Sequence, residues 1–549
     1  MPTTSPLEYH LRNMFWGVRG EWVMIVVARK VAEHVLIPYS MPCPHYCMAG
    51  RYTKILEFCR YAGISGSLVC RQKLHTCQAV QAHLLGQPTG LTHPHLMQEN
   101  EITPGISSNE YAQRRDNLIK VLRNTHYGKL HEKHILIFSS SPEYFMGPDV
   151  PYPFRQNSNF LYLTGYQEPD SVLIVEIGGN NMPGQKYKTT FFTRPRDPSR
   201  EIWDGPRSGT EGAIEHFGFH KAHPISKLPQ IMLERFNDKN CHIWYDHMDP
   251  PHPLINKEIT DVLFNNAKFK FSRIHRVGHL VELLRLVKSP AEISLLKKCS
   301  SITAQGFIKT MARTKAGIQE SQLHNIMEYE CKKLGADRLS FPPVVATGSM
   351  ANTLHYVSNN HILRDGELLL VDSGCEYNGY SSDTTRVWPV NSKFTKPQRQ
   401  LYEVMLKIQK NCIKLCQVGS SLDKLYQAMI FMMEEDFEAL KLIPKGLQRH
   451  QKQQLVRKLC PHHIGHYLGM DVHDVSSVGK NLPLSEGMVI TIEPGLYVRD
   501  GMDVPARYKG TGIRIEDDIL ITQKGPVVLT SECLKEIDEL ENIVGTAVK

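Results

Sequence analysis

The last third of the chain contains five residues that could bind metal ions, each within a distinctive local phrase. The phrases are VDSGCEYNGYSSDTTRVWPV, HHIGHYLGMDVHD, ITIEPGLY and GIRIEDD, and the residues are Asp372, Asp383, His466, Glu493 and Glu516. Brought together, these carboxylates and the imidazole would carry a charge of about −4, which cannot be buried without a cationic partner. Two divalent metal ions would neutralise this charge, so the set predicts a two-metal site.

Short apolar runs position the acidic residues. LLLVDSG and MVITIEPG are rich in Val, Ile and Leu and deliver an acidic residue close before a Gly turn, so both are predicted to be buried strands. GIRIEDDILIT alternates in part, which predicts a strand with Arg514 and Glu516 on one face and Ile513 and Ile515 on the other. Strands hold side chains more precisely than loops do, which suits a preorganised metal site.

Each of these features alone has an ordinary structural explanation. An Asp near a Gly is usually a turn residue, and a single His is more often a packed or surface residue. Here, however, Asp372 and Asp383 have ten residues between them, and a His-rich stretch follows from His462 to His473. The joint occurrence in this order favours a metal site over a purely structural role.

At these phrases the chain resembles aminopeptidase P, the pita-bread metallopeptidases that remove an N-terminal residue when proline follows it. Within that family it is most similar to the mitochondrial members. The similarity runs from about Leu85 to the C-terminus and includes LGQPTGLTHPHL, FRQNSNFLYLTGYQEPDSVLIV, RPRDPSREIWDGPRSGT, RLVKSPAEI and FPPVVATGSMANTLHYV. The resemblance implies an α/β creatinase-like N-terminal domain followed by an α+β pita-bread catalytic domain.

The resemblance also implies a role for each metal-binding residue. Asp372 is similar to the two-oxygen ligand of one metal, and Asp383 and Glu516 resemble the carboxylates that bridge both metals. His466 and Glu493 resemble the remaining ligands of the second metal. An oxygen-rich set without thiolate suits manganese or magnesium better than structural zinc. The family favours manganese, so two divalent ions, Mn²⁺, are the expected cofactors.

The expected reaction is hydrolysis of the bond before proline. A hydroxide bridging two metal ions is a nucleophile near neutral pH, because the metals lower the pKa of bound water. It would attack the carbonyl of the N-terminal residue. By resemblance, His473 stabilises the developing oxyanion, and Glu493 passes a proton from the attacking water to the leaving proline nitrogen.

Three further residues resemble substrate-contacting positions: His355, His462 and Arg514. His355 and His473 would line the pocket around the proline, and Arg514 would steady Glu516 and nearby polar groups by charge-assisted hydrogen bonds. An alternative for each of the three is a supporting role, in which it orients a metal ligand from behind.

Other functions on the same fold remain open alternatives. An Xaa-Pro dipeptidase (prolidase) shares the fold and the metal set but accepts only dipeptides. A methionine aminopeptidase would lack the N-terminal domain. A non-catalytic binding protein would have lost metal ligands, whereas all five are present here.

The length of 549 residues is too great for one core and predicts two domains plus an extension. We expect an N-terminal domain at 85–275, with a helix at YAQRRDNLIKVL and strands at HILIFSS, SVLIVEI, TTFFTRP and HIWYD forming a parallel or mixed sheet. It holds no candidate metal cluster, so we expect it to cover the active-site cleft and make subunit contacts. The family is commonly dimeric, which implies a homodimer.

The catalytic domain is expected at 276–549. Two helical patterns separated by a Ser-Pro start signal open it, and further helices are predicted at about 396–416 and 421–440.

Residues 1–84 form a basic extension that lies outside the resemblance. They contain nine Lys or Arg, four Glu and no Asp, a composition that resembles an organelle transit peptide. We therefore expect a mitochondrial (matrix) protein, with the cytoplasm as the alternative. The stretch from Met48 fits a transit peptide better than the true start does. This suggests either that translation also begins at Met48 or that the first 47 residues are an atypical extension.

The remaining patterns indicate no nucleic-acid partner and no membrane span. KGLQRHQKQQLVRKL is basic, but without interleaved aromatic residues it is predicted to be a solvated helix. WVMIVVARKVAEHVLI is too short and too charged to cross a membrane. The thirteen cysteines are an odd number and do not resemble a disulfide framework, and Cys375 is predicted to be a small core residue.

Overall fold

The computed structural model describes residues 84–127, 132–178, 186–235, 241–265 and 273–548. Residues 1–83 of the predicted basic extension, including Met48 and the apolar run at 22–37, lie outside them. Across the described residues, no helix combines the length and apolarity needed to span a bilayer.

The N-terminal part contains a six-stranded sheet with the order β10-β9-β3-β6-β7-β8. The pairs β3–β6 and β6–β7 are antiparallel, whereas β3–β9, β9–β10 and β7–β8 are parallel, so the predicted mixed sheet is confirmed. The strands are β3 (His134–Ser139), β6 (Val172–Ile177), β7 (Lys188–Thr193), β8 (Lys221–Pro224), β9 (His242–Trp244) and β10 (Ile274–His275). Two small hairpins are formed by β1 (Glu101–Thr103) with β2 (Ile106–Ser107) and β4 (Phe145–Gly147) with β5 (Val150–Pro151).

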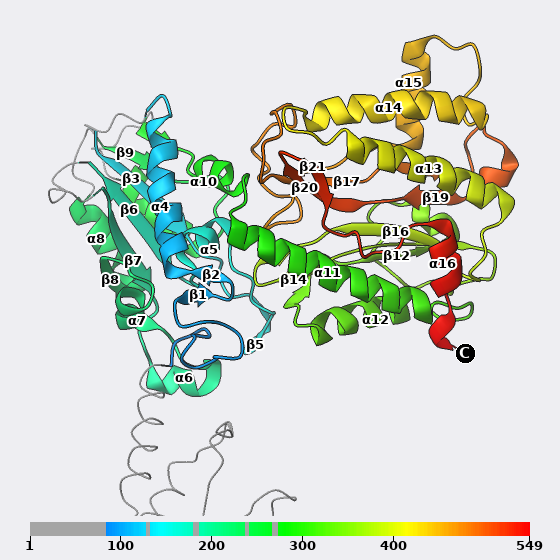
Figure 1. Ribbon diagram of the computed structural model, residues 1–549. Coiled ribbons are helices and arrows are strands. Elements are labelled where there is room, and N and C mark those ends of the chain that lie inside the picture. Colours follow the sequence, from blue (N-terminus) through cyan, green and yellow to red (C-terminus); the bar gives the residue numbers. More distant parts are fainter. Residues whose placement is uncertain (1–83, 128–131, 179–185, 236–240, 266–272, 549) are drawn as a thin grey trace, which may run out of the picture. The chain divides into compact units, whose positions relative to one another are not determined.

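Helices cover both faces of this sheet, because its strands are apolar on both sides. In β3, Ile135 and Ile137 pack into one core, and Leu136 and Phe138 pack into another on the opposite face. Figure 1 shows α4 crossing one face. The helices are α4 (Ser108–Arg123), α5 (Ser158–Thr164), α6 (Pro198–Asp204), α7 (Gly209–Glu215), α8 (Leu228–Arg235) and α9 (Pro253–Phe264).

Two helices lead into the second part, as predicted: α10 (Gly278–Arg285) and α11 (Pro290–Arg313). Ser289 caps α11 through a capping box, in which its hydroxyl accepts from the amide of Glu292 and the Glu292 carboxylate accepts from the amide of Ser289. Pro290 occupies the first turn, where its missing N–H is not needed. The Ser-Pro pattern therefore starts a helix.

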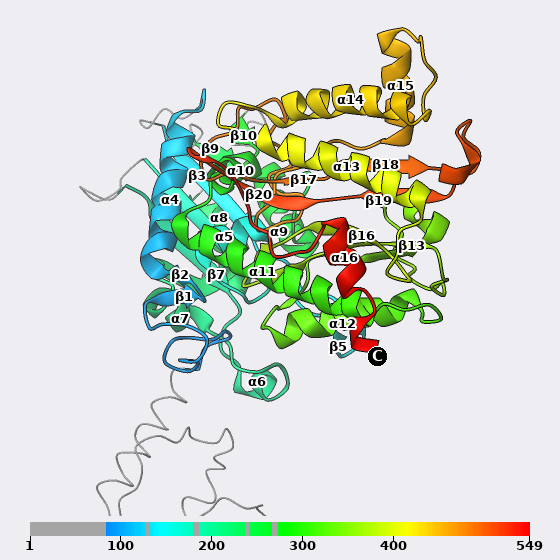
Figure 2. The ribbon, with the colours of Figure 1, turned by 45° about the vertical axis from the view of Figure 1, so that its right-hand side comes forward.

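The second part is a layered α+β arrangement. In Figures 1 and 2, α13 and α14 lie side by side along one side of the strands, and α11 and α12 lie along the other. The helices are α12 (Glu320–Lys333), α13 (Lys396–Lys414), α14 (Leu422–Ala439), α15 (Arg449–Leu459) and α16 (Ile537–Ile543). The strands are β11 (Arg338–Leu339), β12 (Val344–Thr347), β13 (Leu368–Ser373), β14 (Cys375–Tyr377), β15 (Tyr380–Ser381), β16 (Thr384–Pro389), β17 (Val489–Ile492), β18 (Gly495–Val498), β19 (Thr511–Arg514), β20 (Asp517–Thr522) and β21 (Gly525–Val528).

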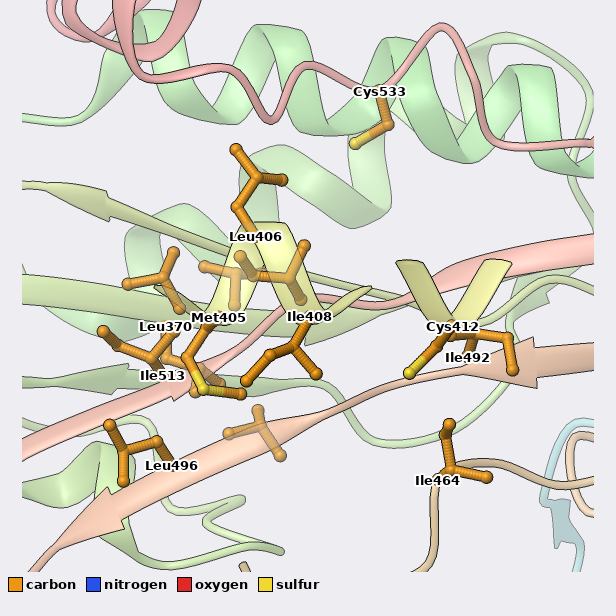
Figure 3. Packing of buried hydrophobic residues seen from close by; sticks show 14 of the residues in the cluster. Leu370, Met405, Leu406, Ile408, Cys412, Ile464, Ile492, Leu496, Ile513 and Cys533 are labelled. Carbon is orange, nitrogen blue, oxygen red and sulfur yellow. The ribbon is translucent and has the colours of Figure 1, made fainter. Parts of the chain in front are cut away.

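The apolar face of α13 seals the strands that carry the acidic residues. Figure 3 shows Met405 and Ile408 of this helix near Leu370, Leu496 and Ile513 of the strands. This packing fixes the backbone at the strand ends. The predicted core role of Cys375 is also confirmed, since its side chain is fully buried, and the eight cysteines of the described residues are all buried.

The prediction of one continuous strand at GIRIEDDILIT is wrong. β19 ends at Arg514 and pairs with β18, whereas β20 begins at Asp517 and pairs with β17 and β21. The strand breaks because the amides of Ile515 and Glu516 donate to Pro494 O (3.3 Å) and Thr385 O (3.1 Å), outside both ladders. The predicted faces are nevertheless correct, because Ile513 and Ile515 enter the core.

Apolar packing continues from the first part into the second. One cluster of buried side chains contains Phe160 and Leu163 of α5 together with Tyr380, Val489 and Leu520 of the second part. A polar contact supplements it, since Arg155 Nε donates to Glu376 Oε2 at 2.6 Å.

Candidate metal centre

The nine predicted site residues line a single cavity of about 400 Å³. They are Asp372, Asp383, His466, Glu493 and Glu516, with His355, His462, His473 and Arg514. The lining residues all lie between Leu354 and Glu516, so the described residues of the N-terminal part contribute none. The covering role expected for that part stays a prediction.

Two antiparallel strands position the first carboxylates. Asp372, near the end of β13, lies opposite Thr385 of β16, and Asp383 immediately precedes β16. The chain turns at Gly374, where an added Cβ would lie 1.7 Å from the carbonyl oxygen of Ser382. Only glycine permits this close approach of the two backbones.

The other two carboxylates stand at strand ends. Glu493 follows β17, and Glu516 lies in the break between β19 and β20. The hydroxyl of Thr385 donates to Glu516 Oε2 at 2.7 Å and so orients that carboxylate.

The hydrogen bonds of His466 determine which ring nitrogen faces the carboxylates. Its Nδ1 lies 3.1 Å from the carbonyl oxygen of Tyr467, which can only accept, so Nδ1 carries the proton. Its Nε2 lies 3.4 Å from Asp383 Oδ2 and 3.9 Å from Glu493 Oε1. The ligand atoms of Asp383, His466 and Glu516 lie within 4.8 Å of one another. Nε2 therefore presents a lone pair to the same space as the carboxylate oxygens.

The electrostatics of the cavity fit a bound cation. Burial raises the pKa of Asp383 and Glu516 well above their usual range, and the neighbouring carboxylates raise it further. Burial also raises the pKa of Glu493. Asp372 Oδ1 and Asp383 Oδ1 are buried, yet neither accepts a hydrogen bond from any described residue. Oxygen atoms left in this state fit metal ligands, because a buried carboxylate otherwise needs donors.

Arg514 bonds nearby polar groups, as expected, but its hydrogen bonds among the described residues do not reach Glu516 directly. Its direct carboxylate partner is Asp372, since Nη2 donates to Asp372 Oδ2 at 2.5 Å. It reaches Glu516 only through Thr385, whose hydroxyl accepts from Nε at 3.0 Å and donates to Glu516. Arg514 thus holds one carboxylate directly and another through a hydroxyl.

Of the three histidines predicted to contact the substrate, His462 has hydrogen-bond partners for its ring, whereas His355 and His473 have none among the described residues. His462 Nδ1 donates to the carbonyl oxygen of His463, so Nε2 accepts from the hydroxyl of Tyr497 at 2.9 Å, and that hydroxyl accepts from Arg514. His473 packs against His466 with ring centroids 4.4 Å apart, and burial, with His466 and His355 nearby, lowers its pKa to about 4. In the part of the chain that the structure describes, no residue hydrogen-bonds the rings of His355 or His473.

Three site residues were not identified from the sequence. Thr385 and Tyr497 were inside the quoted phrases, and the spacing of Thr385 two residues after Asp383 is a signal that the two could share a strand face. Lys480 also lines the cavity, where Nζ donates to the carbonyl oxygen of Gly465 at 3.0 Å. No local pattern marks Lys480.

Comparisons with known proteins agree with this arrangement. Residues 294–523 match the model of metallopeptidase family M24, and residues 111–244 match that of the aminopeptidase P N-terminal domain. Human Xaa-Pro aminopeptidase 3 is 42% identical over 492 residues, which cover 88% of this chain and 96% of that protein. Intermediate cleaving peptidase 55, mitochondrial, of Arabidopsis thaliana is 38% identical over 484 residues, covering 88% of this chain and 91% of that protein.

Among solved structures, aminopeptidase P from E. coli in its low-pH form aligns with a TM-score of 0.73 and 32% identity. The alignment covers 81% of this chain and 99% of that one. Both domain models match in order, and the relatives are matched over nearly their full length. The chain therefore belongs to the aminopeptidase P family of the M24 metallopeptidases.

Proposed function

We propose that the protein is a metal-dependent aminopeptidase that releases the N-terminal residue from peptides with proline in the second position. The observation that carries this proposal is the convergence of five ligand side chains on one cavity, in which two buried carboxylate oxygens have no hydrogen-bond donor among the described residues. Family membership and the similarity to human Xaa-Pro aminopeptidase 3 support the same reaction.

Asp372, Asp383, His466, Glu493 and Glu516 would hold two divalent metal ions, and we propose Mn²⁺ from the oxygen-rich donor set. When bound, the ions lower the pKa of water and offset the charge that develops on the substrate carbonyl.

The side chains of this protein then supply orientation and proton transfer. Glu493 is proposed to accept the proton of the attacking water and to return it to the proline nitrogen. His473 has a pKa of about 4 and is neutral at pH 7, so its imidazole has one N–H to donate to the carbonyl oxygen of the substrate. His462 is held by Tyr497, which is itself bonded by Arg514, and is proposed to contact the substrate.

Proline specificity follows from the shape of the substrate. An Xaa-Pro bond has no N–H and a fixed φ, so a site that selects it must recognise the ring by contact and not by a backbone hydrogen bond. His355 and His473 lie in the same cavity without ring hydrogen bonds to other described residues, and they are proposed to face this ring.

The wider setting is also a proposal. We propose domains at 85–275 and 276–549 after the basic extension, a homodimer formed through the N-terminal domain, and a mitochondrial location. The location is supported by the name of the Arabidopsis relative, a mitochondrial peptidase.

The test is cleavage of defined peptides by protein stripped of metal and reloaded with Mn²⁺. An Xaa-Pro-Yaa tripeptide should lose its first residue, whereas an Xaa-Ala-Yaa tripeptide should remain intact. Cleavage of the Xaa-Pro dipeptide alone would establish the prolidase alternative. Glu493→Ala should abolish turnover while the far-ultraviolet circular dichroism spectrum remains that of the wild type, and an active variant would refute the role of Glu493.

A further inference from the structure

The loop that carries His473 has little regular structure to hold it. Residues 471–480 contain no helix or strand, and the His473 side chain is exposed to the cavity. Its ring packs against His466, with centroids 4.4 Å apart, and receives no hydrogen bond from the described residues. The position of the imidazole therefore depends strongly on the backbone on either side of it.

Two buried cations hold the acidic residues on both sides of His473. Arg285, the last residue of α10, donates from Nη2 to Asp471 Oδ2 at 2.7 Å and also to Asp474 Oδ1. Lys288 Nζ donates to Asp474 Oδ2 at 3.2 Å. The side chain of Arg285 is 4% exposed and that of Asp474 is 0% exposed. One guanidinium thus ties together the positions two residues before and one residue after His473.

The backbone of this loop is strained at the next position. Val475 has φ +46° and is buried. A β-branched side chain rarely adopts this left-handed conformation, and such strain persists only where the surroundings enforce it. The ion pairs of Asp474, which directly precedes Val475, help to enforce it, together with backbone hydrogen bonds from Asp474 N to Tyr467 O (3.0 Å) and from Val478 N to Val475 O (2.9 Å).

The contacts of Arg285 with Asp471 and Asp474, called the clamp below, are anchored in the N-terminal part of the chain. Arg285 Nη1 donates to Asn159 Oδ1 at 2.6 Å, and Ser158 Oγ donates to Asp471 Oδ1 at 2.6 Å. Arg155 Nη2 donates to the same oxygen at 3.1 Å and to the carbonyl oxygen of Met470 at 2.8 Å. The loop is therefore fastened to elements that contribute no lining residue to the cavity.

We propose that Arg285 is a positioning residue for the reaction: by joining Asp471 to Asp474 it fixes the strained loop and directs the His473 imidazole at the substrate carbonyl. The inference rests on the proposed function of His473. A planar fork is needed, because Arg285 uses Nη1 for Asn159 and Nη2 for both carboxylates. A lysine would keep the charge but lose this geometry.

The test compares Arg285→Lys with a matched control, Arg114→Lys. Arg114 has the same exposed side-chain fraction, 4%, and also holds buried partners, but it contacts no described residue of 471–480. Arg285→Lys should lower kcat for the tripeptide about 10²-fold with KM nearly unchanged, because a displaced imidazole weakens contacts made only in the transition state. Arg114→Lys should leave kcat close to that of the wild type, because Glu110, Tyr162, Tyr380 and Glu292, with which it makes its polar contacts, do not line the cavity. Equal kcat values for the two variants would overturn the proposal.

A second measurement is independent of activity. Hydrogen exchange of peptides spanning 470–480 should accelerate in Arg285→Lys and not in Arg114→Lys. Unchanged protection in Arg285→Lys would overturn the clamp. If the wild type fails to cleave Xaa-Pro peptides, the proposed function is refuted, and hydrogen exchange still decides whether Arg285 orders the loop.

A double-mutant cycle separates positioning from general support. In the His473→Ala background, Arg285→Lys should cause no further loss of kcat, because Arg285 acts through the imidazole that is already absent. Losses that multiply in the double variant would show that Arg285 supports the fold and not the position of His473.

Discussion

Arg514 Nη2 and Asp372 Oδ2 lie 2.5 Å apart, and this contact determines how the carboxylate is presented. One oxygen of Asp372 is fixed by the guanidinium, while the other, Oδ1, accepts no hydrogen bond from the described residues. The carboxylate is therefore oriented before any cation arrives, with Oδ1 open to a metal and a second lone pair left on Oδ2.

Replacing Arg514 with Lys should weaken metal binding. Lysine keeps the charge but cannot contact Asp372, Thr385 and Tyr497 at once. Loss of such a supporting contact typically lowers metal affinity about 10- to 100-fold. Isothermal titration of the stripped protein with Mn²⁺ would measure this, with Arg399→Lys on the exposed face of α13 as the control. Equal affinities in both variants would contradict the role of Arg514.

Gly374→Ala should disturb the metal centre through the backbone. The new Cβ would meet the Ser382 carbonyl oxygen at 1.7 Å, so β13 and the segment before β16 must separate at Asp372 and Asp383. Overpacking of this kind costs about 1–3 kcal/mol. We expect a lower melting temperature and weaker Mn²⁺ binding. Gly501→Ala, whose Cβ would have no neighbour within 4 Å, should change neither, and a silent Gly374→Ala would refute the argument.

Arg386→Met should lower the free energy of unfolding of the proposed catalytic domain, residues 276–549. The side chains of Arg386 and Asp517 are both 0% exposed, and the distance between Arg386 Nη2 and Asp517 Oδ1 is 2.6 Å. Removal of Arg386 therefore leaves a buried carboxylate whose remaining cationic partner among the described residues is Lys535. Loss of one partner of a buried pair costs about 3–5 kcal/mol. Urea denaturation would measure the change. Exposed Arg399→Met should shift the midpoint only slightly, and a comparable shift in both variants would show that the buried pair has no special weight.

Stability should fall in mild acid because of His275. Burial, together with His242, His134 and Arg273, lowers the pKa of His275 from 6.5 to about 4. Between these two pH values the imidazole of His275 is mostly protonated in the unfolded chain and mostly neutral in the folded chain. The free energy of unfolding therefore falls as the pH drops from 6.5 towards 4, and this contribution is constant above 6.5. In His275→Gln this part of the decline should disappear, whereas exposed His450→Gln should keep the wild-type slope. Identical slopes in all three proteins would exclude His275 as the cause.

The sequence predicted the parts of the site that depend on local pattern. Apolar runs ending in acidic residues predicted β13 and β17, and the Ser-Pro signal predicted the start of α11, because strand burial and helix capping are encoded within a few residues. The break at Glu516 was missed because it depends on an acceptor at Thr385, which lies 131 residues away.

Ion pairs between residues far apart in the chain could not be predicted from the sequence either. The partner of Arg514 is 142 residues distant, and those of Arg285 are 186 and 189 residues distant. The charged residues are evident in the sequence, but periodicity and spacing rules act over single helices and strands. Only the folded topology brings such residues together.

One apolar cluster contains Phe160 and Leu163 of the N-terminal part and Tyr380, Val489 and Leu520 of the second part. Each part alone would therefore expose apolar side chains that are buried in the whole protein. A truncated protein beginning at residue 276 would expose the apolar side chains of this cluster to water and should precipitate during expression. In a calorimeter the intact protein should show one heat-absorption peak, since the two halves must come apart and melt in a single event.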